Sequence, residues 1–457
     1  MDAESIRQRV AEFHKGKKWI LVPDAAAGAT PVVDQLREWD PAGIMVVAAI
    51  EGVGDLPKAD RLRYTRATGD TVMLGIRANH AAIENPDPEL LAAVDSFDPA
   101  HEAMVLGSGF SREATLVGRP VYGARPNAWW ALEDKTIVDQ LWDDAGVRRA
   151  PSAVVPVAEA PAAAADLASD LGTVWVADNS EGWHGGGEYA RWVRSGDDIA
   201  PAVAWFADHA LEVRVMPFLD GIPCSIHGFV TGDGVAVFRP IEMVILRNAE
   251  RPEFVYAQAA NYWDPPAAVQ EAMRAAARNV GGLLSDRFGY LGGFGIDGVC
   301  TADGFFPTEL NPRLSIGHGL HSRAAEMPLG SMERMQTEGD LELSAAELEA
   351  TLATAVTESR RGGLLLPLEG ACTPARVGVD FVDGRAVTVD PNGECDATME
   401  IGSAVMGSII IVRLDPDRTP VGPSIAPRAV AIFDLARDLW NLDIPPLEAA
   451  PDVCAGE

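Results

Sequence analysis

The segment 293–313, GFGIDGVCTADGFFPTELNPR, constrains the fold of this chain more than any other. Two apolar runs flank the loop ADG, and a three-residue loop with glycine in the left-handed position predicts a β-hairpin. Counting back from that loop places Asp297 opposite Glu309, and directly opposed residues share a face with Cβ atoms roughly 5 Å apart. Two carboxylates this close repel each other unless something lies between them, so the hairpin predicts a binding site.

Two further polar residues, Asn311 and Arg313, continue the face that carries Glu309, because side chains alternate along a strand. Carboxylate and amide oxygens suit Mg²⁺, which usually also keeps waters and substrate phosphates as ligands. Asp297, Glu309 and Asn311 therefore form a candidate metal-ligand set. Arg313 beside them suits a phosphate or carboxylate oxygen. The alternative is a surface salt-bridge face in which Glu309 pairs with Arg313.

Composition excludes several classes of protein. The formal net charge of −30 argues against nucleic-acid binding and against attachment to anionic membranes. The five cysteines are scattered without CxxC spacing, which argues against a disulfide framework or zinc site and fits a reducing compartment. The N-terminal segment lacks the apolar core of a signal peptide, and no apolar run reaches membrane-spanning length. We expect a cytoplasmic protein with neither nucleic-acid nor membrane partners.

The length of 457 residues is too great for one core and indicates several domains. KWILVP and IMVVAAI are typical of buried parallel strands, and ALEDKTIVDQLWDDAG carries one apolar stripe that predicts a helix. We predict an α/β domain over residues 1–125, a central domain over 126–335 that holds the hairpin, and a small α+β domain over 336–457.

The hairpin resembles the metal and phosphate signature of ATP-grasp enzymes: acidic residues twelve positions apart, the second within E-x-N-P-R. The resemblance implies that Asp297, Glu309 and Asn311 bind Mg²⁺ against the phosphates of ATP, and that Arg313 holds the transferred phosphoryl group. It also implies the fold class: an α/β and α+β multidomain protein with an ATP-grasp fold, preceded by a pre-ATP-grasp α/β domain and followed by an α+β domain.

Other ATP-grasp features follow in the order that the family shows. Lys135 stands where the family has a lysine that reaches the ATP phosphates; a solvated lysine at a helix end is the alternative. WVADNSEGWHGGGEYARWV resembles the family's glycine loop, which can bring backbone N–H groups to phosphates; a flexible hairpin tip is the alternative. A second family lysine, on the strand before this loop, is absent, and His184 is the candidate to replace it. The loop glycines are Gly185, Gly186 and Gly187.

The segment EVRVMPFLDG resembles the hinge that holds adenine, with Met216, Pro217, Phe218 and Leu219 as the contacts. Pro217 can offer its carbonyl and Leu219 its N–H, whereas Met216 and Phe218 either pack on the ring or belong to the core. In FRPIEMVILR, Arg239 and Arg247 are candidates to meet the substrate or the phosphoryl group. Surface or structural arginines are the alternative for this pair.

The HGGGEY loop, FRPIEMVILR and the C-terminal part look most like pheganomycin-type peptide ligases. The resemblance implies an ATP-dependent ligase that joins a small-molecule or peptide carboxylate to an amine through an acyl-phosphate, in peptide natural-product (antibiotic) biosynthesis. A homodimer is possible. Two alternatives stay open: a carboxylase-like enzyme that phosphorylates bicarbonate, and an ATP-binding regulator without activity, which the absent strand lysine supports.

Overall fold

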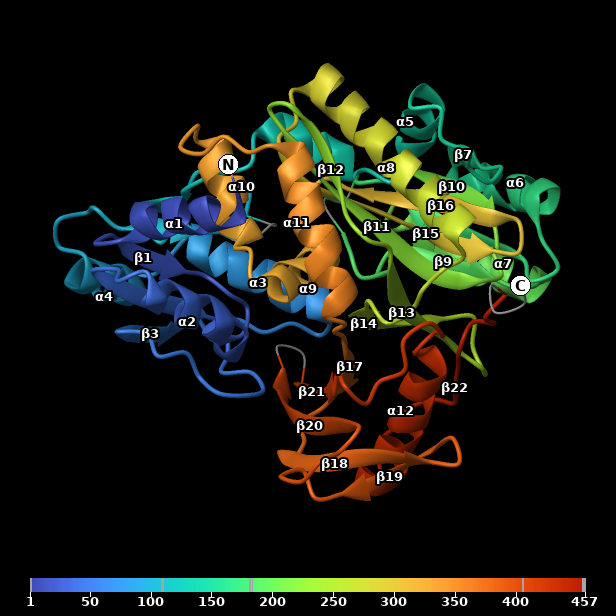
Figure 1. Cartoon of the computed structure of the whole chain (residues 1–457). Coiled ribbons are helices and arrows are strands. Elements are labelled where there is room, and N and C mark those ends of the chain that lie inside the picture. The colour runs from blue at the N-terminus through green and yellow to red at the C-terminus, as the bar shows by residue number, and fades with distance from the viewer. Residues whose placement is uncertain (1, 108–110, 181, 183, 405–406, 454–457) are drawn as a thin grey trace.

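The computed structural model describes residues 2–107, 111–180, 182, 184–404 and 407–453. Four sheets of four or more strands carry the architecture: one at the N-terminal end, two in the centre and one near the C-terminus. Figure 1 shows the N-terminal sheet (blue) beside the central sheets (green to yellow), with the C-terminal sheet (orange to red) below them. Among the described residues, no helix is long and apolar enough to cross a membrane.

The N-terminal sheet is parallel, in the order β3-β2-β1-β4, which confirms the two predicted parallel strands. Alternate residues enter two separate cores, Trp19 and Ile44 on one face and Ile20 and Met45 on the other, because helices cover both faces. The strands are β1 (Lys18–Leu21), β2 (Gly43–Ala48), β3 (Arg61–Tyr64) and β4 (Met104–Leu106); the helices are α1 (Ala3–His14), α2 (Thr30–Glu38), α3 (Val72–Glu84) and α4 (Pro88–Phe97).

Two antiparallel sheets form the centre. The smaller has the order β7-β10-β8-β9 and packs on helices α6 (Ala160–Leu167) and α7 (Gly196–Ala207). The larger has the order β14-β13-β11-β15-β16 and packs on the long helix α8 (Ala267–Phe288). The strands are β7 (Ala153–Pro156), β8 (Thr173–Ala177), β9 (Ala190–Val193), β10 (Glu212–Pro217), β11 (Ile222–Thr231), β12 (Gly234–Val237), β13 (Ile241–Asn248), β14 (Phe254–Ala260), β15 (Gly292–Thr301) and β16 (Gly304–Asn311).

The helix predicted around Lys135 is wrong in its first half. A 3₁₀ turn, η2 (Asn127–Glu133), precedes it, and helix α5 covers only Val138–Asp144. The side chain of Asp134 accepts a hydrogen bond from the backbone N–H of Thr136 at 2.9 Å. Such a local bond competes with the helical pattern, so Lys135 lies in the connection before the helix.

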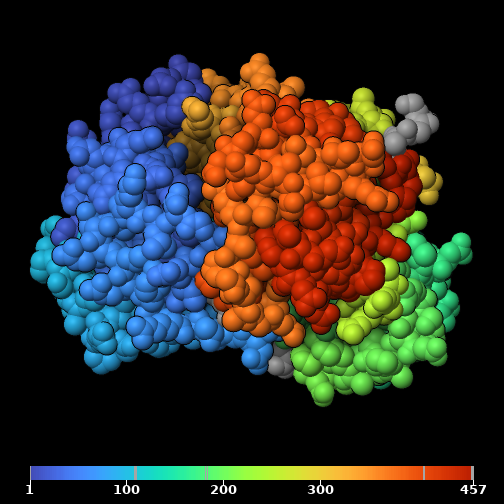
Figure 2. Space-filling view, turned by 90° about the horizontal axis from the view of Figure 1, so that it is seen from below, coloured from blue at the N-terminus to red at the C-terminus, as the bar shows by residue number. Residues whose placement is uncertain are grey.

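The C-terminal sheet is antiparallel, in the order β17-β21-β20-β18-β19, and helix α12 (Ala426–Trp440) packs on it. Helix α11 (Ala345–Glu358) instead packs in a core shared with the N-terminal sheet. Figure 2 shows the C-terminal unit between the first domain (blue) and the central sheets (green). The remaining elements are η1 (Ala26–Ala29), β5 (Thr115–Leu116), β6 (Arg119–Pro120), η3 (Val157–Glu159), α9 (Ile316–Ala325), α10 (Leu329–Thr337), β17 (Gly363–Glu369), β18 (Ala375–Val382), β19 (Arg385–Val389), β20 (Ala397–Ala404), β21 (Gly407–Leu414) and β22 (Leu447–Glu448).

Candidate active site

The hairpin of β15 and β16 brings the two predicted carboxylates opposite each other, as the sequence predicts, but by another route. Thr301 pairs with Gly304, so the loop has two residues and the predicted three-residue loop is wrong. A β-bulge between Asp297 and Gly298 then adds Thr308 to one strand and restores the register, which sets Asp297 opposite Glu309.

The carboxylate pair carries an unusual electrostatic environment. Burial, and secondly the negative charge of Glu309, raise the pKa of Asp297 to about 6. Asn311 donates from Nδ2 to Asp297 Oδ2 at 2.9 Å, and Lys135 Nζ lies 3.1 Å from Glu309 Oε1. Lys135, Arg313 and the Asn311 amide offset the two carboxylates, yet the pKa of Asp297 stays raised, which leaves the site suited to further positive charge.

The donor set fits Mg²⁺. Two carboxylates and one amide face a cavity, and among the described residues no group of three or more His, Cys, Asp or Glu side chains gathers as a closed metal cage. Mg²⁺ is typically held by one or two carboxylates, with substrate phosphates and water completing its shell. Asp297, Glu309 and Asn311 would hold the ion.

Arg313 is fixed beside the metal-ligand set from two sides. Its NH2 donates to Asn311 Oδ1 at 2.9 Å, and its Nε lies 3.2 Å from Glu133 Oε1. Arg125 also contacts Glu133, at 3.0 Å. These contacts hold the guanidinium at the cavity wall, where it can meet an anionic group.

A cavity of about 560 Å³ joins the hairpin to the hinge segment and the glycine loop. Trp192 and Phe254 flank Phe218 at the hinge, with ring centroids 4.6 and 6.0 Å from it. The predicted residues in its described lining are Lys135, Gly185, Gly186, Gly187, Met216, Pro217, Phe218, Leu219, Arg247, Asp297, Glu309, Asn311 and Arg313.

The glycine loop meets Lys135 through a backbone group. Lys135 Nζ donates to the carbonyl of His184 at 3.3 Å. The His184 ring is buried and stacks on Tyr189, with centroids 4.5 Å apart, and it is not among the described lining of the cavity. Burial, then the charge of Lys135, lower the pKa of His184 to about 4, so its imidazole is neutral at pH 7 and a poor substitute for a lysine. Two other residues of the predicted loop, Glu181 and Trp183, lie outside the described residues.

The structure separates the two arginines predicted to meet the substrate. Arg239 forms an ion pair with Asp264 and is absent from the described lining of the cavity. Arg247 does line the cavity, but at the hinge end: its guanidinium lies 4.8 Å from the Phe218 ring centroid and 2.7 Å from Asp220. Arg247 belongs to β13, whereas Arg239 lies in the connection between β12 and β13, and each arginine pairs with a different acidic residue.

Arg214, a buried arginine of β10, also lines the cavity, although the sequence did not predict it there. Its NH2 lies 2.7 Å from Asp139, and its NH1 donates to the carbonyl of Thr308, the bulge residue, at 3.0 Å. Arg214 also pairs with Val176 of β8, on the strand that lacks the family lysine. The available signal was a charged residue between Val213 and Val215, inside an apolar run of the sequence.

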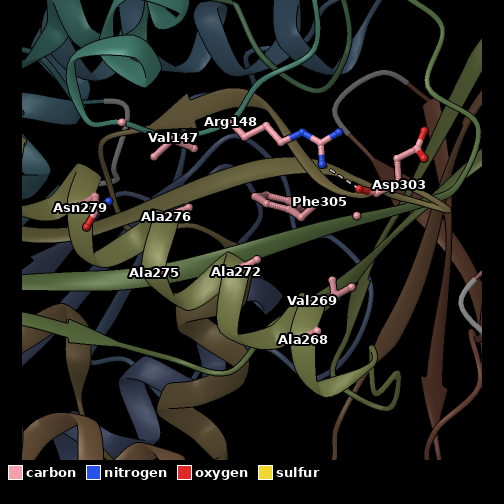
Figure 3. A pocket seen from close by; sticks show the side chains of 12 residues that line it. Val147, Arg148, Ala268, Val269, Ala272, Ala275, Ala276, Asn279, Asp303 and Phe305 are labelled. Carbon is pink, nitrogen blue, oxygen red and sulfur yellow. Dashed lines mark hydrogen bonds between the residues drawn. The ribbon is translucent and has the colours of Figure 1, made fainter.

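A second, smaller cavity of about 340 Å³ lies between α8 and the hairpin turn (Figure 3). Alanines of α8 form much of its wall, and Arg148 donates to the carbonyl of Asp303 at 3.0 Å across one end. No carboxylate pair or cationic cluster occurs among its described lining residues, so the candidate chemistry lies in the larger cavity.

Comparison with known proteins identifies the fold. No family model and no curated protein matches this sequence. Solved structures do match. Pyruvate carboxylase from Rhizobium etli matches at 16% identity and TM-score 0.56, over 95% of this chain and 38% of that chain. The biotin carboxylase domain of 2-oxoglutarate carboxylase from Hydrogenobacter thermophilus matches at 14% identity and TM-score 0.53, over 95% and 92%. L-amino acid ligase from Bacillus licheniformis matches at 14% identity and TM-score 0.51, over 95% and 98%.

These likenesses show the predicted fold class: an α/β and α+β multidomain chain with an ATP-grasp fold, an α/β domain before it and a small α+β domain after it.

Proposed function

We propose that this chain is an ATP- and Mg²⁺-dependent ligase that joins a carboxylate to an amine through an acyl-phosphate. The single observation that carries the proposal is the hairpin: Asp297 and Glu309 stand opposite each other, with Lys135, Asn311 and Arg313 around them in one cavity. The similar domain from Hydrogenobacter thermophilus was solved with MgADP and bicarbonate. The MgADP in that structure supports ATP and Mg²⁺ as the cofactors of this chain.

The nucleotide would lie along the cavity from hinge to hairpin. The backbone N–H and carbonyl of Phe218 are already bonded, to Gly172 and Ser169. The carbonyl of Pro217 and the N–H of Leu219 would therefore hold adenine, while Met216 and Phe218 pack around it. Gly186 and Gly187 have φ of +61° and +76°, a conformation that favours glycine and brings backbone N–H groups close to phosphate oxygens.

The reaction would proceed in two steps. A carboxylate oxygen attacks the γ-phosphorus, the bond to the bridging oxygen breaks, and ADP leaves. The amine then attacks the acyl carbon, phosphate leaves, and the nitrogen loses a proton. Mg²⁺ supplies charge neutralisation at the phosphates, Lys135 and Arg313 add positive charge on either side, and such electrostatic stabilisation dominates phosphoryl transfer.

The narrower function is a peptide ligase of natural-product biosynthesis, similar to the pheganomycin-type ligases, that accepts an amino acid or peptide as the amine. The HGGGEY loop and FRPIEMVILR support it. In this proposal Lys135 and the hinge residues bind the nucleotide, and the metal ligands are those of the hairpin. The domains span residues 1–125, 126–335 and 336–457. The protein is cytoplasmic and forms a homodimer.

A screen of amino acids and short peptides with ATP and Mg²⁺, read by mass spectrometry and by phosphate release, tests the proposal. A condensed product whose formation depends on an amine supports the ligase. ADP formation that depends on bicarbonate alone would favour the carboxylase alternative. Nucleotide binding without ADP formation for any acid would favour the regulator.

A further inference from the structure

Strand β13 runs along the cavity from the hinge toward the row of the hairpin carboxylate Asp297. Met243, Ile245 and Arg247 alternate along this strand and all three line the cavity. Arg247 stacks on Phe218 and therefore marks the hinge end. Ile241 lies in the row of Ser225 and Asp297, so Met243, two residues nearer the hinge, lies close to the row of the hairpin carboxylate and two strands to its side.

One side of the cavity is an apolar wall on β13, β14 and the start of α9, which we define as Met243, Ile245, Tyr256 and Ile316. These four side chains belong to one packed cluster together with Leu320. All four line the cavity, and Ile245 pairs directly with Tyr256 across β13 and β14. Ile316 starts helix α9, immediately after the E-x-N-P-R segment, so the wall adjoins the metal-ligand set.

The electrostatics of Tyr256 place the wall beside the reacting groups. Burial chiefly, and then the charge of Asp297, raise the pKa of the Tyr256 hydroxyl, while the charge of Arg313 opposes this shift. Tyr256 therefore lies within electrostatic range of both residues. A carboxylate positioned at Arg313 for attack on the γ-phosphate would direct its own substituent toward the apolar wall.

The charged residues that precede Met243 in the sequence pair with other parts of the structure. Glu242 points to the opposite face, where Ser424 Oγ and the backbone N–H of Ile425 donate to it at 2.6 and 2.8 Å. Arg239 pairs with Asp264. Among the described lining residues, the charged groups nearest the apolar wall are those of the hairpin and Arg313, which contact one another, and Arg247, which follows Ile245 on the same face and pairs with Asp220 at 2.7 Å.

We propose that the carboxylic acid activated by this enzyme carries an apolar side chain, which packs on Met243, Ile245, Tyr256 and Ile316. The inference rests on the proposed function and adds the substrate class to it. A charged side chain at this wall would lose its hydration without gaining a partner, which is costly in an apolar environment. We expect kcat/KM for apolar acids to exceed that for charged acids by at least about 100-fold.

Hydroxylamine makes the test independent of the natural amine. Its nitrogen attacks the acyl carbon of the acyl-phosphate, phosphate leaves, and a hydroxamate forms that iron(III) detects. Leucine, methionine and phenylalanine are compared with aspartate, glutamate and lysine, both as free amino acids and as the C-terminal residues of glycyl dipeptides. Hydroxamate and ADP should form with the apolar set in preference to the charged set.

Two outcomes overturn different parts of the reasoning. Equal or better hydroxamate formation with the charged acids refutes the apolar substrate class while the ligase stands. ADP formation with bicarbonate but with no acid of the panel refutes the proposed function itself, and the substrate inference with it.

Substitution at the wall gives an independent test. Met243→Lys should raise kcat/KM for glutamate relative to leucine by at least about 10-fold, because an ammonium group now faces the acidic side chain. Val387→Lys makes a similar change on the exposed edge strand β19, where the side chain is 37% exposed, and should leave the ratio unchanged. Thermal unfolding checks that each variant folds.

A smaller change covers the case in which lysine prevents folding. Met243→Ala enlarges the wall and should raise kcat/KM for phenylalanine relative to leucine by several-fold, since it adds room without adding charge. Wild-type preference ratios in a folded Met243→Ala variant would place the substrate side chain elsewhere and refute the assignment of the wall.

Discussion

Replacing Glu309 with glutamine tests the carboxylate pair directly, because the change removes one negative charge and keeps the size of the side chain. Glu309 contacts Lys135 at 3.1 Å and stands opposite Asp297. The variant loses the attraction to Lys135 but also loses the repulsion with Asp297. The two effects oppose each other, so we expect the free energy of unfolding to change by no more than about 1 kcal/mol.

Catalysis should respond far more strongly than stability. The metal-ligand set drops from two carboxylates to one, and the charge that positions Mg²⁺ against the phosphates is halved. Loss of an electrostatic contact of this kind typically lowers turnover by about 100- to 1,000-fold, equivalent to roughly 3–4 kcal/mol of transition-state stabilisation.

The assay measures ADP release at saturating ATP over a range of Mg²⁺ concentrations, for wild type, Glu309→Gln and a matched control. Glu394→Gln provides the control, because its side chain is 95% exposed and makes the same chemical change away from the cavity. Near-normal ADP release by a folded Glu309→Gln variant, with an unchanged Mg²⁺ requirement, would refute the assignment of the hairpin as the metal site.

Three further predictions follow from contacts around the site. Arg214→Met should raise the Mg²⁺ concentration needed for half-maximal activity, because Arg214 bonds the carbonyl of the bulge residue before Glu309; an unchanged Mg²⁺ requirement would contradict this. Burial raises the pKa of Glu242 from 4.5 to about 7, so the folded chain holds a proton that the unfolded chain releases. Its contribution to stability, roughly 3 kcal/mol at most, is complete below about pH 4.5 and lost as pH rises toward 7, and denaturant titrations should show Glu242→Gln with a flatter pH dependence. Gly317→Ala should destabilise the protein by about 1–3 kcal/mol in chemical denaturation, since the new Cβ would lie 2.1 Å from His227 Cε1; wild-type stability would contradict the packing.

The sequence predicts much of the fold because periodicity and turn chemistry are local properties. The parallel pair β1 and β2 forms as predicted. The opposition of Asp297 and Glu309 is also confirmed, although the two-residue loop and the bulge each shift the register by one residue in compensating directions. A bulge depends on tertiary contacts such as the one from Arg214, so spacing alone does not indicate it.

The errors concern residues whose position depends on distant partners. Lys135 precedes its helix because Asp134 bonds Thr136. Arg239, which is not among the described lining residues, pairs with Asp264, 25 residues later. The place of Arg214 in the cavity wall was not predicted, because it depends on an ion pair with Asp139 in a different element. No local pattern specifies such pairs, and the roles of the site residues stay predictions.

Strand β13 has a consequence for any attempt to shorten this protein. While Met243 and Ile245 line the cavity, Val244 and Leu246 between them are fully buried in the core of the C-terminal unit, and β22 pairs with the same strand. Truncation before residue 363 would expose these side chains to water and leave Glu242 without its donors from residues 424–426. The smallest autonomous form of the protein therefore extends through β22, and a fragment cut from the middle of the chain should aggregate.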